Sequence, residues 1–270
     1  MKRIFAPLIE GVKLVVKSPA VVLINLFGTA LLAAAVMLWL PNKISTVPRL
    51  ILDTLVAVLI TIAWWWLDAG TAAYTYRASR GDAAVRDSYR QGLRRALLFG
   101  MLAVIWIGLW LLFDGMREFA RDLGSLVYSK LSAANRGRVG YQGVQGFFIW
   151  ILDLKQWFLL TAIILPWVTM LCGAPLSRDS AKAAVKSYTR IGYWIGLFVA
   201  VVVAVWIPAV LVEWRFGTGL EAEMASMIVR LSFAFVLFIF GWLLALAVSA
   251  IASRPDEIGA APLESAAVSG

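Results

Sequence analysis

Four acidic residues lie within or beside the long apolar segments of this 270-residue chain: Asp53, Asp68, Asp153 and Glu213. Ionisable side chains in such segments are the usual sites of transport or proton chemistry, because a charge at the centre of a bilayer is costly. Each of the four lies toward an end of its segment, so contact with water at the membrane surface is the simpler expectation. Two alternatives are an outer polar vestibule of Asp53, Asp153 and Glu213, and a polar path of Asp68 with Asn25 and Thr29.

The residue types on which many enzymes depend are scarce in this chain. It has no histidine and a single cysteine, Cys172, which we expect to be a free structural thiol. That composition excludes histidine-ligated haem, the usual zinc ligand sets and thiolate clusters. The sequence lacks a phosphate-binding glycine loop and a nucleophile elbow, and the adjacent Ser129 and Lys130 would diverge on a helix. We therefore predict a protein without enzymatic activity, cofactor or metal site.

Basic residues recur at a spacing of four in three segments, Ile4–Lys17, Asp82–Arg95 and Arg178–Arg190, each of which leads into an apolar run. This spacing places each set along one helix face. Such a helix would lie in the membrane interface with its cations toward lipid phosphates, each contributing about 1 kcal/mol. The alternative is that these residues only set the topology. The predicted headgroup-binding residues are Lys13, Lys17, Arg86, Arg90, Arg94, Arg178, Lys182, Lys186 and Arg190.

The composition is that of a membrane protein, with 61% hydrophobic residues, 15% charged residues and a mean hydropathy of +0.83. The apolar residues collect into runs close to the ~20 residues that cross a bilayer core, and such runs must be helical to satisfy their backbone groups. We predict an all-α polytopic protein, with six transmembrane helices arranged as three hairpins, each preceded by a basic amphipathic interfacial helix. The predicted spans are Ala20–Leu40, Leu50–Ala73, Ala96–Phe113, Gln156–Gly173, Ile191–Val212 and Ile228–Ala252.

The distribution of Lys and Arg between the loops predicts the orientation. By the positive-inside rule it places both termini in the cytoplasm, which indicates a multi-pass protein of the inner (plasma) membrane. Several tryptophans fall near span ends, as in an interfacial aromatic belt. Trp64, Trp65 and Trp66 could instead form a cage for a cationic ligand. Consecutive helix positions point about 100° apart, which favours the belt.

We expect one membrane domain, residues 1–254, followed by a polar tail, residues 255–270. A long outer loop, residues 114–146, begins with an amphipathic helix over Asp114–Leu131 and continues with glycine at every third position from Gly137 to Gly146. This glycine spacing predicts a flexible or tightly turning linker, and partner binding is the function we favour for the loop. Within the spans, Pro166 and Pro208 are expected to kink their helices.

Two of the basic segments share a short motif, with Ser88–Tyr89 and Ser187–Tyr188 preceded by alanine and followed by basic residues. The arrangement resembles bacterial six-span membrane families related to the membrane domain of some glycerophosphodiester phosphodiesterases. In these families a segment reading roughly A-x-x-x-S-[WY] precedes a span more than once. The resemblance is confined to the predicted hairpins and implies a related fold, and no catalytic residue follows from it.

These observations favour a non-enzymatic accessory or scaffold protein of the membrane. It would bind other membrane proteins and the anionic head groups of membrane lipids, and no nucleic acid. The alternative is a transporter of a small solute or lipid, since six spans and internal repetition suit that role. An intramembrane enzyme acting on lipid is a third hypothesis.

Overall fold

The computed structural model describes residues 2–39, 47–82, 84–214 and 219–254, and all regular secondary structure within them is helical. Six helical segments are long and apolar enough to cross a membrane, which confirms the predicted all-α class. The predicted tail, residues 255–270, lies outside the described residues. The elements are α1 (Lys2–Val16), α2 (Pro19–Trp39), α3 (Val47–Ala78), α4 (Val85–Gly115), α5 (Arg117–Lys130), α6 (Ala133–Val139), α7 (Tyr141–Leu154), η1 (Lys155–Leu159), α8 (Leu160–Gly173), α9 (Arg178–Ser187), α10 (Ile191–Val201), η2 (Val202–Trp206), α11 (Ile207–Glu213) and α12 (Leu220–Ala252).

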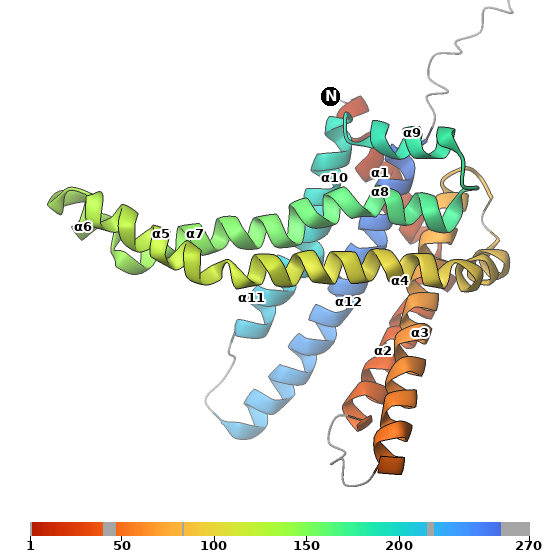
Figure 1. Cartoon of the computed structure of the whole chain (residues 1–270), viewed down its shortest axis with the longest axis horizontal. Helices are drawn as coiled ribbons and strands as arrows, with labels where there is room; N and C mark the ends of the chain where they lie inside the picture. Colours follow the sequence, from red (N-terminus) through yellow and green to blue (C-terminus); the bar gives the residue numbers. More distant parts are fainter. Residues whose placement is uncertain (1, 40–46, 83, 215–218, 255–270) are drawn as a thin grey trace, which may run out of the picture.

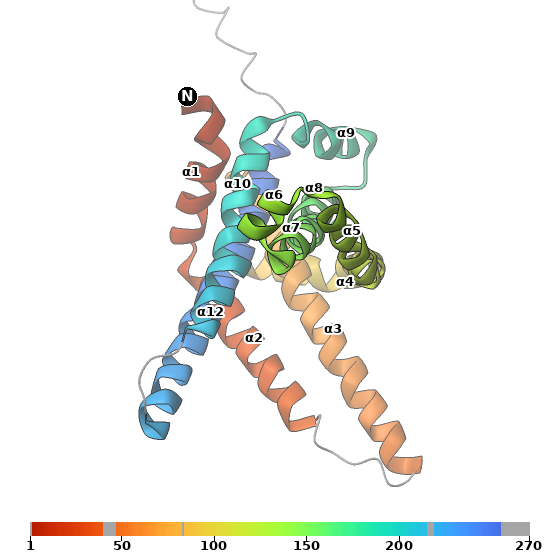
Figure 2. The ribbon, with the colours of Figure 1, turned by 90° about the vertical axis from the view of Figure 1, so that its left-hand side faces the viewer.

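The six segments follow two directions. Helices α2, α3, α10–α11 and α12 extend roughly along one direction, whereas α4–α5 and α7–α8 run across them (Figure 1). Helix α4 packs against both α3 and α8, and α12 packs against α10 and α11. The first basic segment forms α1, which lies beside α10 and α12 (Figure 2). The second basic segment differs from the prediction, because it forms the first turns of the continuous helix α4 and not a separate helix.

The core lies around the C-terminal half of α12, where every residue from Leu243 to Ala252 is buried. This stretch is rich in alanine and leucine, and its small side chains allow α1, α8 and α10 to approach closely. A second close approach joins α3 and α4 at Gly70 and Gly92, where a Cβ on Gly92 would overlap the Gly70 backbone. This crossing fixes the part of α3 that follows Asp68.

Arginines bind carbonyl groups at the C-terminal end of α12 and just beyond it. Arg190 donates to Ala252 O (2.6 Å) and Arg254 O (3.0 Å), and Arg80 donates to Ser253 O (3.1 Å). A helix C-terminus carries a partial negative charge and carbonyls that lack helical partners, so cations stabilise it. At the same end, a hydrogen bond from Arg77 lowers the pKa of the Asp82 carboxyl.

Two spans contain a five-residue π-helical segment, η1 and η2. Segment η2 ends two residues before Pro208, whose missing N–H removes the α-helical bond to the Ala204 carbonyl. Pro166 in α8 likewise frees the Ala162 carbonyl, and the buried Tyr193 hydroxyl donates to that oxygen. Both predicted prolines therefore coincide with local departures from α-helical bonding.

The predicted outer loop is helical throughout most of its length. Its first helix is confirmed as α5, but the predicted glycine linker is wrong, because Gly143 and Gly146 lie inside α7. Of the glycines in this region, only Gly140 has a positive φ, 69°, and it lies between α6 and α7. Close packing of α5 on α7, seen where a Cβ on Gly124 would lie 3.1 Å from Gln145 Cα, offsets the low helix propensity of glycine. We refer to α5, α6 and α7 (residues 117–154) as the distal arm.

Candidate functional site

Two adjoining cavities lie among the spans. The larger has a volume of about 460 Å³ and lies between α3, α4, α8 and α12, and the smaller, about 210 Å³, extends from there toward α10 and the two π-helical segments. A volume of several hundred Å³ is that of a small-molecule site. The two cavities share five lining residues, which mark their junction: Trp64, Asp68, Trp106, Thr161 and Trp242.

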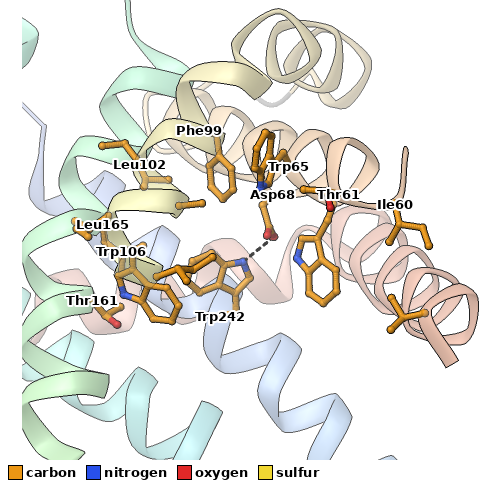
Figure 3. A pocket seen from close by; sticks show the side chains of 16 residues that line it. Ile60, Thr61, Trp65, Asp68, Phe99, Leu102, Trp106, Thr161, Leu165 and Trp242 are labelled. Atoms are coloured by element: carbon orange, nitrogen blue, oxygen red, sulfur yellow. Dashed lines mark hydrogen bonds between the residues drawn. The ribbon is translucent and has the colours of Figure 1, made fainter. Parts of the chain in front are cut away.

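Asp68 is the only residue with a charged side chain among those that line these two cavities, all of which belong to the described chain. Its Oδ1 accepts a hydrogen bond from the Trp242 indole Nε1–H at 3.1 Å, and Figure 3 shows the carboxyl directed toward that indole. No lysine or arginine lines either cavity to balance the carboxylate. A buried carboxylate is costly unless a cation or several hydrogen bonds compensate it.

Indole rings surround this carboxyl group. Trp64 lies one helical turn before Asp68 on the same face of α3, and Trp65 also lines the larger cavity. A Cβ at Gly100 would overlap the Trp65 ring, so this glycine of α4 makes the space that the indole fills. Trp106 from α4 packs edge-on against Trp157 in η1, with 6.5 Å between ring centroids, and Trp157 lines the smaller cavity.

The π-helical segments form part of the wall of the smaller cavity. Trp157 belongs to η1, and Ala204 and Val205 belong to η2. A π-helical turn widens the backbone and displaces the side chains that follow it, and such turns are common at functional sites. The sequence gives no direct signal for η1, and only Pro208 points to η2.

A separate polar cluster lies one turn beyond Asp68 on α3. The Asn25 amide nitrogen has two N–H groups and three acceptors within reach: Thr71 Oγ1 (2.9 Å), Val21 O (2.9 Å) and the Tyr89 hydroxyl oxygen (3.3 Å). Thr71 and Tyr89 hydroxyl oxygens lie 3.0 Å apart, and all three side chains are buried. Thr71 has one hydroxyl hydrogen, which can go to Leu67 O or to Asn25 Oδ1.

The predicted acidic residues have different surroundings. Asp153 accepts from Arg117 at 2.8 Å at the base of the distal arm, Asp53 is buried in α3, and Glu213 is exposed at the end of α11. None of these three lines any of the three cavities described between the helices, so none of those cavities is the predicted vestibule. Of the polar path, Thr29 lines the smaller cavity with Asp68, whereas Asn25 belongs to the polar cluster.

Eight of the nine predicted headgroup-binding residues are exposed: Lys13, Lys17, Arg86, Arg90, Arg94, Arg178, Lys182 and Lys186. Arg190 differs, because its guanidinium is half-buried and binds the C-terminus of α12. The two Ser-Tyr pairs make structural contacts. Ser88 and Ser187 donate to the carbonyls of Ala84 and Ala184, 2.7 and 2.6 Å away.

The tryptophan lining is the feature that sequence reasoning missed. The aromatic-belt interpretation considered Trp64, Trp65 and Trp66 together and found that they cannot face one ligand. In the structure the lining takes two of these residues and adds Trp106 and Trp242 from other helices, while Trp66 donates instead to the Tyr89 carbonyl. The available signal was the spacing of four between Trp64 and Asp68, which places an indole and a carboxyl on one helix face.

Searches with the sequence and with the structure find no matching family model, no similar curated protein and no similar solved structure.

Proposed function

We propose that this protein binds a small amphipathic solute in the cavity around Asp68 and carries it across the membrane. The supporting observation is a cavity of about 460 Å³ among membrane-spanning segments, with apolar walls and one carboxyl group at its junction with a second cavity. Ligand sites commonly combine an apolar lining with a few placed polar groups. We therefore favour the transporter hypothesis over the accessory one.

The protein chemistry of the site favours binding without a covalent reaction. Asp68 and Thr161 are accompanied in the lining by one further hydroxyl in each cavity, Thr61 in the larger and Thr29 in the smaller. Cys172, the only thiol in the sequence, is buried and lines neither cavity. The described lining residues therefore show no nucleophile paired with a base. The shape of the cavities, their aromatic walls and their single charged group are features of a binding site.

Filling the larger cavity tests the proposal. Ala103 lines it from α4, so Ala103→Phe should occupy the space that the solute needs. With the protein reconstituted into vesicles, we expect uptake of an amphipathic dye such as ethidium to fall at least about tenfold, which corresponds to about 1.4 kcal/mol of lost binding. The measurement is the initial rate of dye accumulation relative to protein-free vesicles.

The matched control lies on the same helix. A Cβ at Gly108 would meet no atom within 4 Å, so Gly108→Phe adds the same ring to an open face of α4. This control should transport at the wild-type rate. Equal uptake by wild-type, Ala103→Phe and protein-free vesicles would contradict the carrier proposal.

The distal arm supports a second candidate function, the accessory or scaffold role. The segment Val85–Lys130 has 46 residues, about twice the ~20 that cross a bilayer. Beyond the bundle, α5 packs mainly on α7, and the arm leaves Phe119, Phe147 and Trp150 exposed. We expect other membrane proteins to bind this arm. Stoichiometric partners that copurify in mild detergent with the wild type, and are lost with Phe119→Ser plus Trp150→Ser, would support this role.

We also propose a finer arrangement of the chain in its membrane. In this proposal the spans form three hairpins, and both termini face the cytoplasm of a plasma membrane. The eight exposed basic residues would bind anionic head groups at the cytoplasmic surface, with about 1 kcal/mol for each residue near the lipid. Support comes from their spacing in the sequence and from their exposure. Accessibility of single introduced cysteines, in a Cys172→Ala background, would test the orientation.

A further inference from the structure

We infer that the solute is a hydrophobic organic cation and that it takes the place of a proton on the Asp68 carboxyl. This inference deepens the proposed function and rests on it. It specifies the charge of the ligand and the ion that is exchanged, neither of which follows from cavity size alone.

The first argument is charge balance. Asp68 is the only charged residue in the lining of the two cavities, and its hydrogen-bond partners in the described structure are neutral indoles, Trp242 at 3.1 Å and Trp64. A carboxyl group among apolar walls is less costly to bury with a proton bound or with a cation beside it than as a bare anion. A ligand that carries positive charge completes the site, whereas an anion would add a second unpaired negative charge.

The second argument is the type of side chain around the charge. Trp64, Trp65, Trp106 and Trp242 line the larger cavity, and Trp157 lines the smaller one. The face of an indole attracts cations more strongly than the face of any other side chain, by about 0.5–2 kcal/mol for each well-placed ring. Apolar walls accept the hydrocarbon part of the same ligand, and cavities of this size exceed what a metal ion needs. The preferred chemistry is thus a quaternary ammonium or phosphonium carrying apolar groups.

Other ionisable groups on the neighbouring helices do not replace the missing cation. Helix α2 has none, and α12 has none between Arg230 and Arg254. On α4, the Tyr89 hydroxyl belongs to the polar cluster, and the Arg95 guanidinium donates to Leu171 O at 2.8 Å. On α8, Cys172 is buried. None of these groups lines either cavity, so Asp68 is the group at which a proton and a cation compete.

The exchange is balanced in charge and atoms. When the cation enters, the O–H bond of the Asp68 carboxyl breaks, the proton passes to water, and the carboxylate pairs with the cation. When the cation leaves, a proton from water returns to the carboxylate. One proton therefore moves out for each monovalent cation that moves in, and the charge of the site stays constant.

The test compares probes of similar shape and different charge. Purified protein in detergent is titrated with tetraphenylphosphonium, with neutral triphenylphosphine oxide and with the anion tetraphenylborate, and binding is followed by tryptophan fluorescence and calorimetry. We expect the phosphonium to bind at least about tenfold more tightly than the neutral probe, about 1.4 kcal/mol, and more tightly at pH 8 than at pH 5.5. Proton release should appear in weakly buffered solution with a pH-indicator dye.

Two variants assign these effects to Asp68. Asp68→Asn should bind cation and neutral probe equally, without proton release, whereas Asp68→Glu should keep both the cation preference and the pH dependence. If Asp68→Asn does not fold, the wild-type probe comparison, the proton count and Asp68→Glu still decide the matter.

The outcomes separate this inference from the proposed function. Equal binding of the cation and the neutral probe to the wild type, lost in Ala103→Phe, would leave the cavity as a solute site and overturn the cation inference. A cation preference that persists in Asp68→Asn would also overturn it. Binding of none of the probes would overturn the inference and the solute site together.

Discussion

Two polar sites lie within one turn of each other on α3 and differ in how completely their polar atoms are bonded. At Thr71, the Asn25 amide and the Tyr89 hydroxyl meet within 3.3 Å, and each buried group has a partner on another helix. At Asp68, a carboxyl group that needs more compensation has only the neutral indoles of Trp242 and Trp64 as partners, and it lines two cavities. The same helix therefore carries a completed polar cluster and an incomplete one.

This difference indicates which polar groups of a membrane protein are candidates for a functional role. Side-chain hydrogen bonds between spans join helices, and mutational cycles assign them about 0.6 kcal/mol on average. The cluster of Asn25, Thr71 and Tyr89 fits that structural role, since it joins α2, α3 and α4. An ionisable group that keeps an unfilled space beside it contributes little to the fold, and ligand binding offers a reason for its presence.

The largest effect that distinguishes the two sites is expected from Asn25→Leu. This substitution keeps the branched shape of the side chain but removes the amide, and it leaves buried hydroxyl groups with fewer partners. We expect a loss of about 1–3 kcal/mol in stability, or an unfolding midpoint lowered by roughly 2–8 °C, measured by thermal unfolding in detergent. The affinity for tetraphenylphosphonium should change less than about twofold.

Thr29→Val is the matched control for that substitution. Thr29 lies one turn further along α2 and lines the smaller cavity beside Asp68, so its loss should leave the unfolding midpoint nearly unchanged. If Asn25→Leu instead weakened cation binding at an unchanged midpoint, Asn25 would belong to the ligand path and the comparison would fail.

The sequence predicts much of the fold but little of the site. Composition and run length are sufficient to predict the helical class and six segments able to cross a membrane, both of which are confirmed. The glycine-rich part of the outer loop was predicted wrongly, because helix propensity is local whereas the packing of α5 on α7 is tertiary. That packing keeps Gly143 and Gly146 in a helix.

The site escaped prediction for a related reason. Asp68 was a candidate because a single acidic residue in an apolar run is visible in the sequence. Its surroundings come from Trp106 and Trp242, which lie 38 and 174 positions further along the chain and meet Asp68 only when α4 and α12 pack on α3. Helical periodicity describes one helix at a time and carries no information on which helices meet.

A smaller and sharper effect is expected from Trp242→Phe. The change keeps an aromatic face in both cavities but removes the indole N–H that donates to Asp68 Oδ1 at 3.1 Å. A hydrogen bond to a charged group contributes about 1.5–3 kcal/mol, so the carboxylate form, which the bound cation requires, loses that stabilisation. The empty, protonated site loses less stabilisation, because its hydrogen bond to the indole joins two neutral groups. The affinity for tetraphenylphosphonium at pH 8 should therefore fall roughly tenfold.

Trp66→Phe provides the control, because Trp66 lies two residues before Asp68, lines neither cavity and donates to the Tyr89 carbonyl. Its loss should leave cation affinity unchanged and lower stability by about 1 kcal/mol.

The pH dependence separates two roles of Trp242. If its indole stabilises the carboxylate, Trp242→Phe should shift the pH dependence of cation affinity to higher pH. Without the indole N–H the carboxylate is less stable, so Asp68 releases its proton only at a higher pH. If Trp242 only fills space, the affinity for tetraphenylphosphonium would fall by the same factor at pH 5.5 and pH 8. The difference between the two polar sites would then depend on the Asp68 carboxyl alone and not on its indole partner.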